Sequence, residues 1–167
     1  MKNLNTLIIS LFLVNTSFAI ESLVGQIVVN KPVINGQKAI KIATYMEKYS
    51  NRFNIDKHRA AAIAMQESGY EAITTMRNNK PFDVGMYQIN IRTIKEYGFD
   101  IKRLSSDMDY STWAFMKVLS NKQKICKKLG REAWSCYHSR TPNLRKKYIK
   151  LVNRWYKTDM VVVTKAQ

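Results

Sequence analysis

The sequence predicts a single domain built mainly from α-helices. Its 167 residues suit one domain, and 46% apolar residues are enough to form a core. Apolar residues recur at helical spacing through most of the chain after residue 36, and capping residues and glycines bracket these segments. Three prolines and six glycines exclude a collagen-like or proline-rich architecture. There is no internal repeat, low-complexity tract or second domain.

An extended lead-in and two helices are expected first. Residues 20–36 are rich in β-branched side chains and contain turn residues, which predicts an extended segment with a short strand or hairpin. Apolar spacing predicts a helix from about Gln37 to Ser50. Asp56 is a good N-cap for a second helix over Lys57–Ser68, and Gly69 is suited to end it.

The second half is expected to contain further helices joined by loops. Residues 71–85 have no periodicity and predict a loop. The expected helices are one over Ile91–Tyr97 capped by Asn90, a longer one capped by Asp107 or Asp109 and broken at Gly130, a short piece over Arg131–Tyr137, and a last one from Thr141-Pro142 to about Tyr156. The domain therefore spans residues 37–157, and residues 158–167 form a tail.

The composition limits the partners and the chemistry. Twenty-eight Lys and Arg against twelve Asp and Glu give a net charge of +16, so an acidic partner is expected: nucleic acid, an anionic membrane or a wall polymer with carboxylates. Two cysteines and two histidines are too few for a disulfide scaffold and show no metal-ligand cluster. The sequence predicts no metal site and no cofactor.

Residues 1–19 have the pattern of a secretory signal peptide. A basic start is followed by an apolar stretch and by Ser17 and Ala19, small residues suited to cleavage after Ala19. A membrane anchor is the alternative, but polar residues interrupt the run before the roughly twenty apolar residues that a span needs. We therefore expect a soluble product in the periplasm, with no later membrane span and no nucleic-acid partner.

Glu67 is the strongest candidate for an acid catalyst. It follows Ile63 and Ala64 by four and three residues, so it projects from the apolar face of its helix. Burial and the negative end of the helix dipole both disfavour a charged carboxylate there. A proton held near neutral pH is what a general acid needs. Without further signals, a solvated surface glutamate would be the better interpretation.

A second motif, Gly85-Met86-Tyr87-Gln88-Ile89-Asn90, offers groups that suit a sugar. Gln88 and Asn90 supply donors and acceptors for hydroxyl and N-acetyl groups. Met86 and Tyr87 are expected to present a flat apolar surface to pyranose rings. On its own this hexapeptide could equally be an ordinary polar loop that leads into a helix.

Three motifs in order resemble the soluble lytic transglycosylase family. They are Gln66-Glu67-Ser68-Gly69, the hexapeptide Gly85–Asn90, and Trp134-Ser135-Cys136-Tyr137-His138-Ser139. The small VirB1-like members associated with secretion and conjugation are the most similar, over roughly Gln37–Tyr156. The resemblance implies a lysozyme-like α fold with a cleft, and cleavage of the MurNAc–GlcNAc β-1,4 bond of peptidoglycan that leaves a 1,6-anhydromuramyl end.

The resemblance also implies roles for individual residues. Glu67 corresponds to the catalytic acid and base, and the substrate-binding residues would be Ser68, Met86, Tyr87, Gln88, Asn90 and Tyr137. The chain departs from the usual pattern where Met86-Tyr87 replaces Leu-Met and where Cys136-Tyr137-His138 replaces Ala-Tyr-Asn. These departures concern contacts to the sugar more than the chemistry.

The family mechanism needs only one carboxyl. Most glycosidases use two, and Asp83 and Glu71 are the loop candidates for a partner, although neither has a setting that recommends it. In the transglycosylase mechanism, Glu67 protonates the leaving oxygen and then takes the proton of the muramic 6-hydroxyl, which attacks the anomeric carbon intramolecularly.

Cys126 and Cys136 are ten residues apart, and in an oxidising compartment a disulfide between them is favoured over two buried free thiols. His58 is expected to be solvated or capping, and His138 to be either structural or near substrate. Five aromatic residues at helical spacing are expected mostly in the core, with one or two of them lining a groove: Tyr110, Trp113, Trp134, Tyr148 and Trp155.

The leading hypothesis is a secreted lytic transglycosylase that opens the wall for a type IV or type III secretion, conjugation or pilus apparatus. A lysozyme-type muramidase and a catalytically silent wall- or assembly-binding protein of the same fold are the alternatives.

Overall fold

The protein is mainly helical, as the sequence predicts. The computed structural model describes residues 20–78 and 80–157, so the predicted signal peptide and tail lie outside the described residues. After a helical segment at residues 20–30, the order is α2 (Gly36–Phe53), α3 (Lys57–Ser68), β1 (Thr74–Arg77), β2 (Lys80–Val84), β3 (Ile89–Asn90), α4 (Ile91–Tyr97), α5 (Ile101–Ser106), α6 (Met108–Ile125), the 3-10 helix η1 (Lys127–Tyr137) and α7 (Pro142–Asn153).

The helices α3, α4 and α6 start where the capping residues predict. The side chain of Asp56 accepts hydrogen bonds from the backbone N–H groups of His58 and Arg59, and Asn90 and Asp107 cap α4 and α6 in the same way. Side-chain acceptors of this kind satisfy N–H groups that the helix itself leaves unpaired. Gly69 and Gly98 end α3 and α4 in the left-handed conformation.

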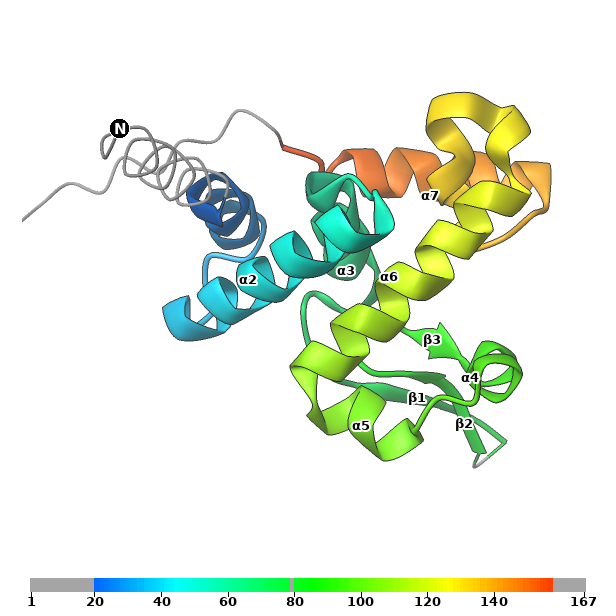
Figure 1. Ribbon diagram of the computed structural model, residues 1–167, viewed down its shortest axis with the longest axis horizontal. Helices are drawn as coiled ribbons and strands as arrows, with labels where there is room; N and C mark the ends of the chain where they lie inside the picture. Colours follow the sequence, from blue (N-terminus) through cyan, green and yellow to red (C-terminus); the bar gives the residue numbers. More distant parts are fainter. Residues whose placement is uncertain (1–19, 79, 158–167) are drawn as a thin grey trace, which may run out of the picture.

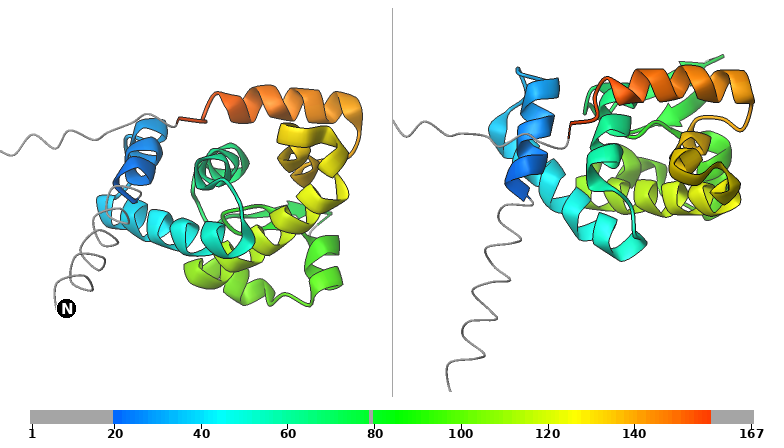
Figure 2. Two further views of the ribbon diagram at one scale, coloured as in Figure 1. Left: turned by 45° about the horizontal axis from the view of Figure 1, so that its top comes forward. Right: turned by 90° about the horizontal axis from the view of Figure 1, so that it is seen from above.

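Helix α3 is enclosed by the rest of the domain. Five consecutive residues, Ala60 to Ala64, are fully buried, so neighbours cover every face of the helix. The small side chains of its four alanines let other helices approach closely. Figure 2 shows α3 nearly end-on between α2, α6 and α7, and Figure 1 shows α6 running between the small sheet and the pair η1 and α7. The last turn of α3, which carries Glu67, therefore continues from a helix that is packed on all sides.

The predicted extended lead-in at residues 20–36 is wrong, because residues 20–30 are helical. Leu23 and Ile27 are fully buried one turn apart, and Gln26 and Asn30 donate hydrogen bonds to the carbonyl oxygen of Trp155 at 2.9 and 2.7 Å. Packing of this face against the domain overrides the β-propensity of its valines and isoleucines.

The predicted loop at residues 71–85 contains a hairpin. Strands β1, β2 and β3 form an antiparallel sheet in that order, with Thr74 opposite Val84 and Arg77 opposite Lys80. All four residues of β1 are exposed. Without a buried face, the strand has no alternation of apolar and polar residues for the sequence to reveal.

The short helix α5 is not among the expected elements. The long helix α6 ends at Ile125, before the expected break at Gly130, and Gly130 is instead a non-helical residue within η1. No helix in the described part of the chain is both long and apolar enough to cross a membrane.

Candidate active site

Glu67 lies in the wall of a cavity of about 320 Å³. It occupies the last turn of α3, and the left-handed Gly69 follows it. The opposite wall comes from β2, β3 and the start of α4, and α6 and the end of η1 close the space. The Glu67 side chain is partly exposed, so a ligand in the cavity can reach its carboxyl group.

The surroundings of Glu67 favour its protonated form. Burial and, to a smaller extent, the negative charge of Asp83 raise the pKa of this carboxyl from its ordinary 4.5 to about 7. A hydrogen bond from Tyr148 opposes the shift, because a donor stabilises the charged form. Near neutral pH, Glu67 therefore has a proton to give and can also function as a base.

Tyr148 fixes the orientation of the Glu67 carboxyl. Its hydroxyl group donates a short hydrogen bond to Oε1 of Glu67 from the middle of α7. The Tyr148 ring stacks on His138 with ring centres 4.6 Å apart and planes within 10°, and the centre of the Trp134 ring lies 6.0 Å away. Sequence reasoning placed Tyr148 in the core and missed this contact, since nothing near residue 148 in the chain indicates which side chain it meets.

Tyr137 also lines the cavity. Its hydroxyl group donates a hydrogen bond of 2.6 Å to the carbonyl oxygen of Tyr87, and its ring packs edge-on against Phe115. Burial and the nearby charge of Glu67 raise the pKa of Tyr137 well above its ordinary value. The phenol therefore stays neutral and ties the third motif to the second.

The second motif brings two of its predicted polar residues to the cavity. Gln88 and Asn90 both line it. The Gln88 amide donates to the carbonyl oxygens of Ile73 and Gly85 at 3.0 and 2.8 Å, and the Asn90 amide donates to Asp83 Oδ1 at 3.0 Å. These bonds hold both side chains in place at the cavity wall.

The expectation that Met86 and Tyr87 present a surface to sugar rings is wrong. Their side chains are 2% and 1% exposed and belong to the core. Tyr87 stacks face to face on Phe115 at 4.2 Å, and its hydroxyl group pairs with Thr112 at 2.8 Å. When apolar residues stand next to polar ones in a sequence, the pattern does not show whether the apolar side chains line a binding site or pack in the core.

Ser68 connects the first two motifs and does not line the cavity. Its hydroxyl group donates to the carbonyl oxygen of Met86 at 2.6 Å and accepts from the backbone N–H of Glu71 at 3.1 Å. Its geometry is that of a residue that fixes the helix end, rather than of the substrate contact that the resemblance implied.

Gly85 is required by a close approach of two backbones. Its φ is +77°, and a Cβ at this position would lie 2.4 Å from the carbonyl oxygen of Leu104 in α5. Only glycine combines this conformation with that contact. The glycine of the second motif therefore sets the distance between α5 and the cavity wall.

The two loop carboxylates have different surroundings. Asp83 lines the cavity on β2, so the same cavity contains two carboxyl groups. Glu71 instead forms ion pairs with Lys31 and with Lys38, the latter at 2.6 Å. Lys31 also donates to the carbonyl oxygen of Gly69 at 2.7 Å, which ties the N-terminal segment to the end of α3.

The predicted disulfide is confirmed: Cys126 and Cys136 are bonded, which excludes two free thiols. The bridge closes η1 directly before Tyr137. Among residues 20–78 and 80–157, no group of three or more His, Cys, Asp and Glu side chains could hold a metal ion.

The fold and the site together define a lysozyme-like domain, a mainly helical body in which a glutamic acid of raised pKa faces a cleft. The family model described as the Transglycosylase SLT domain matches residues 44–150, and the chain therefore belongs to that family. No curated protein and no solved structure matches the chain significantly.

Family membership indicates lytic transglycosylase activity on peptidoglycan. The matched range begins in α2 and ends in α7, so it contains Glu67, both later motifs and Tyr148. The helical segment at residues 20–30 lies before this range, although its side chains bond to the domain.

Proposed function

We propose that this chain is a periplasmic lytic transglycosylase in which Glu67 serves first as the acid and then as the base. The observation that supports this most directly is the pKa of about 7 at a carboxyl that a ligand can reach. At this value both protonation states are accessible near neutral pH, as the two steps require.

In the first step Glu67 donates its proton to the oxygen that joins MurNAc to GlcNAc. The bond between the MurNAc anomeric carbon and this oxygen breaks, and GlcNAc leaves with a free 4-hydroxyl group. In the second step the Glu67 carboxylate accepts the proton of the MurNAc 6-hydroxyl, whose oxygen bonds to the anomeric carbon. The product is the 1,6-anhydro ring, and Glu67 is protonated again.

The second step needs no activated water. The 6-hydroxyl belongs to the bound sugar, so its attack benefits from a high effective concentration. Tyr148 holds Oε1 of Glu67 during both steps, and its hydrogen bond favours the carboxylate that the second step uses.

Asp83 favours a second candidate function. A second carboxylate in the cavity of Glu67 is the arrangement that a hydrolase uses to activate water. The chain would then be a muramidase with reducing MurNAc ends as products. Asp83 already accepts a hydrogen bond from Asn90. In the transglycosylase, Asp83 would therefore hold Asn90 at the cavity wall and would not activate water.

The proposal extends to the cellular setting. We take residues 1–19 as a signal peptide, residues 37–157 as the catalytic domain, and a secretion, conjugation or pilus apparatus as the partner. This rests on the pattern of the first nineteen residues and on the similarity of the three motifs to VirB1-like proteins. N-terminal sequencing of the exported protein should begin at Ile20; a retained leader would contradict the assignment.

Digestion of purified sacculi followed by mass spectrometry tests the activity. The mature protein should release 1,6-anhydromuramyl products, and Glu67→Gln should release none. Glu96→Gln, which removes an exposed carboxyl on α4, is the matched control and should retain activity. Reducing ends would establish the muramidase, and no products from any of the three proteins would indicate the silent binding protein.

A further inference from the structure

A basic groove continues from the catalytic cavity along the hairpin and α4. One part of it, of about 580 Å³, is lined by Arg77, Lys80 and Lys95 together with apolar side chains. A second part, of about 260 Å³, lies between Arg77, Phe82, Asn90 and Arg92. We define the basic groove by its four cations, Arg77, Lys80, Arg92 and Lys95.

The basic groove and the catalytic cavity share walls. Phe82 lines the cavity that contains Glu67 and both parts of the groove, and Asn90 lines the cavity and the smaller part. A ligand in the groove is therefore adjacent to whatever occupies the cavity. This continuity points to another portion of the same substrate rather than to an unrelated molecule.

The four cations have no acidic partner among the described residues. The ion pairs found there involve other lysines and Arg103. The Arg77 guanidinium instead lies over the Phe82 ring, 5.4 Å from its centre. Cations on a convex helix surface are usually only solvated, but these border a concave surface and leave their charge available to an anionic ligand.

The floor of the groove is apolar. Phe82, Ile91 and Ile101 contribute to it, and Phe82 and Ile101 are 36% and 40% exposed. A fitting ligand therefore combines carboxylates with small aliphatic groups. Peptidoglycan carries these features together on the peptide stem attached to MurNAc, whereas its stem-substituted sugars carry no free carboxylate.

We infer that the basic groove binds the peptide stem of the substrate through its free carboxylates. The inference rests on the proposed function, since it assumes that a glycan occupies the catalytic cavity. It assigns to the β1–β2 hairpin and α4 the selection of glycan strands with charged stems.

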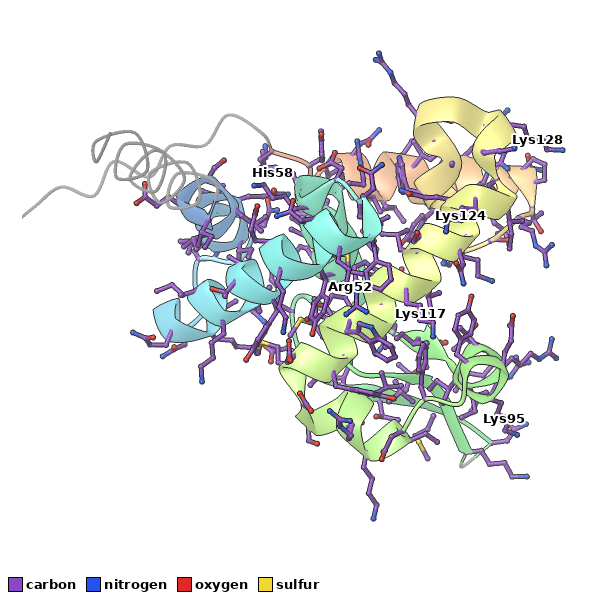
Figure 3. All side chains as sticks on the ribbon, viewed as in Figure 1. Arg52, His58, Lys95, Lys117, Lys124 and Lys128 are labelled. Carbon is purple, nitrogen blue, oxygen red and sulfur yellow. A yellow bond between two sulfur atoms is a disulfide. The ribbon has the colours of Figure 1, made fainter. Side chains whose placement is uncertain are left out.

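The test compares glycan strands with free stem carboxylates and the same strands after the carboxylates have been converted to amides. The variant is Arg77→Gln/Lys95→Gln, which removes one cation from each side of the groove. The control is Lys124→Gln/Lys128→Gln, which removes the same charge from exposed residues; Figure 3 shows Lys95 on α4 and Lys124 and Lys128 at the distant end of α6 and in η1.

The wild type should have a higher kcat/KM on the free-carboxylate strands. The groove variant should lower this preference about fivefold, as expected for two exposed charge contacts, and should cleave the amidated strands as the wild type does. The control variant should keep the preference. Unchanged preference in the groove variant, or an equal loss in the control, would overturn the inference.

Equal loss of activity on both kinds of strand would also overturn it, because the groove would then contact sugar rather than stem. Failure of the proposed function is distinguishable, since the wild type would then either cleave neither kind of strand or leave reducing MurNAc ends in place of 1,6-anhydromuramyl ends.

Discussion

Replacement of Glu67 by glutamine should stabilise the fold at high pH. A carboxyl whose pKa rises from 4.5 to about 7 on folding makes the folded state bind its proton more tightly than the unfolded state does. The stability that this proton supplies is complete below pH 4.5 and is lost as the pH rises through about 7. At about 1.4 kcal/mol per pH unit the full loss is about 3 kcal/mol.

Glutamine has nearly the same shape and never ionises, so it avoids this loss. Because the Glu67 side chain keeps some contact with solvent, we expect Glu67→Gln to raise the free energy of unfolding at pH 8 by about 1–3 kcal/mol. The amide oxygen can still accept the hydrogen bond from Tyr148.

Urea denaturation at pH 4 and pH 8 measures the effect. At pH 8 the midpoint of the variant should exceed that of the wild type by about 1 M, and at pH 4 the two should nearly coincide. Glu96→Gln, on the exposed surface of α4, controls for loss of a negative charge from a basic protein. Equal midpoints for Glu67→Gln and the wild type at pH 8 would refute the argument that the site disfavours the carboxylate.

Further predictions concern the residues around the catalytic carboxyl. Tyr148→Phe removes a hydrogen bond that lowers the Glu67 pKa, so the high-pH limb of the activity profile should move to higher pH. Asp83→Asn removes a charge that raises this pKa, so the limb should move to lower pH. Shifts of both variants in the same direction would contradict these assignments. Gly85→Ala should destabilise the fold by more than about 1 kcal/mol, since its Cβ would lie 2.4 Å from the α5 backbone. Thermal unfolding measures this, and an unchanged Tm would show that α5 moves away without cost. Cys126→Ser/Cys136→Ser should lower the free energy of unfolding by about 3 kcal/mol, the value for closing a loop of this length. A wild type that is equally stable with and without a reducing agent would rule this out.

Helices with local signals were predictable from the sequence. Asp56, Asn90 and Gly69 determine helix ends through contacts with their own neighbours in the chain, so their residue types are sufficient. The spacing from Ile63 also places Glu67 on the apolar face of α3, but its choice as the candidate acid needed the three motifs that resemble the family.

Features that depend on distant partners were not predictable. The helix at residues 20–30 forms where Leu23 and Ile27 are buried against the domain, and β1 has no buried face at all. Tyr148 meets Glu67 across 81 residues of sequence, so only the packing of α7 near α3 reveals it. Asp83 joins the cavity because β2 pairs with β3, which the sequence did not indicate as strands.

Burial was the other source of error. Met86 and Tyr87 lie beside Gln88 in the motif to which the family resemblance assigns sugar binding. They nevertheless face the core, while Gln88 faces the cavity. The turn at Gly85, with φ of +77°, and the positive φ of Gln88 turn neighbouring side chains in opposite directions. A positive φ is rare for glutamine, so the residue type of Gln88 gave no indication of its conformation.

A carbon NMR titration of the Glu67 side-chain carboxyl, identified by its absence from the Glu67→Gln spectrum, tests the proposed acid most directly. Its chemical shift should change with a midpoint near pH 7. A midpoint at or below 4.5, the ordinary value for a glutamate, would leave the cleft without a proton donor at neutral pH.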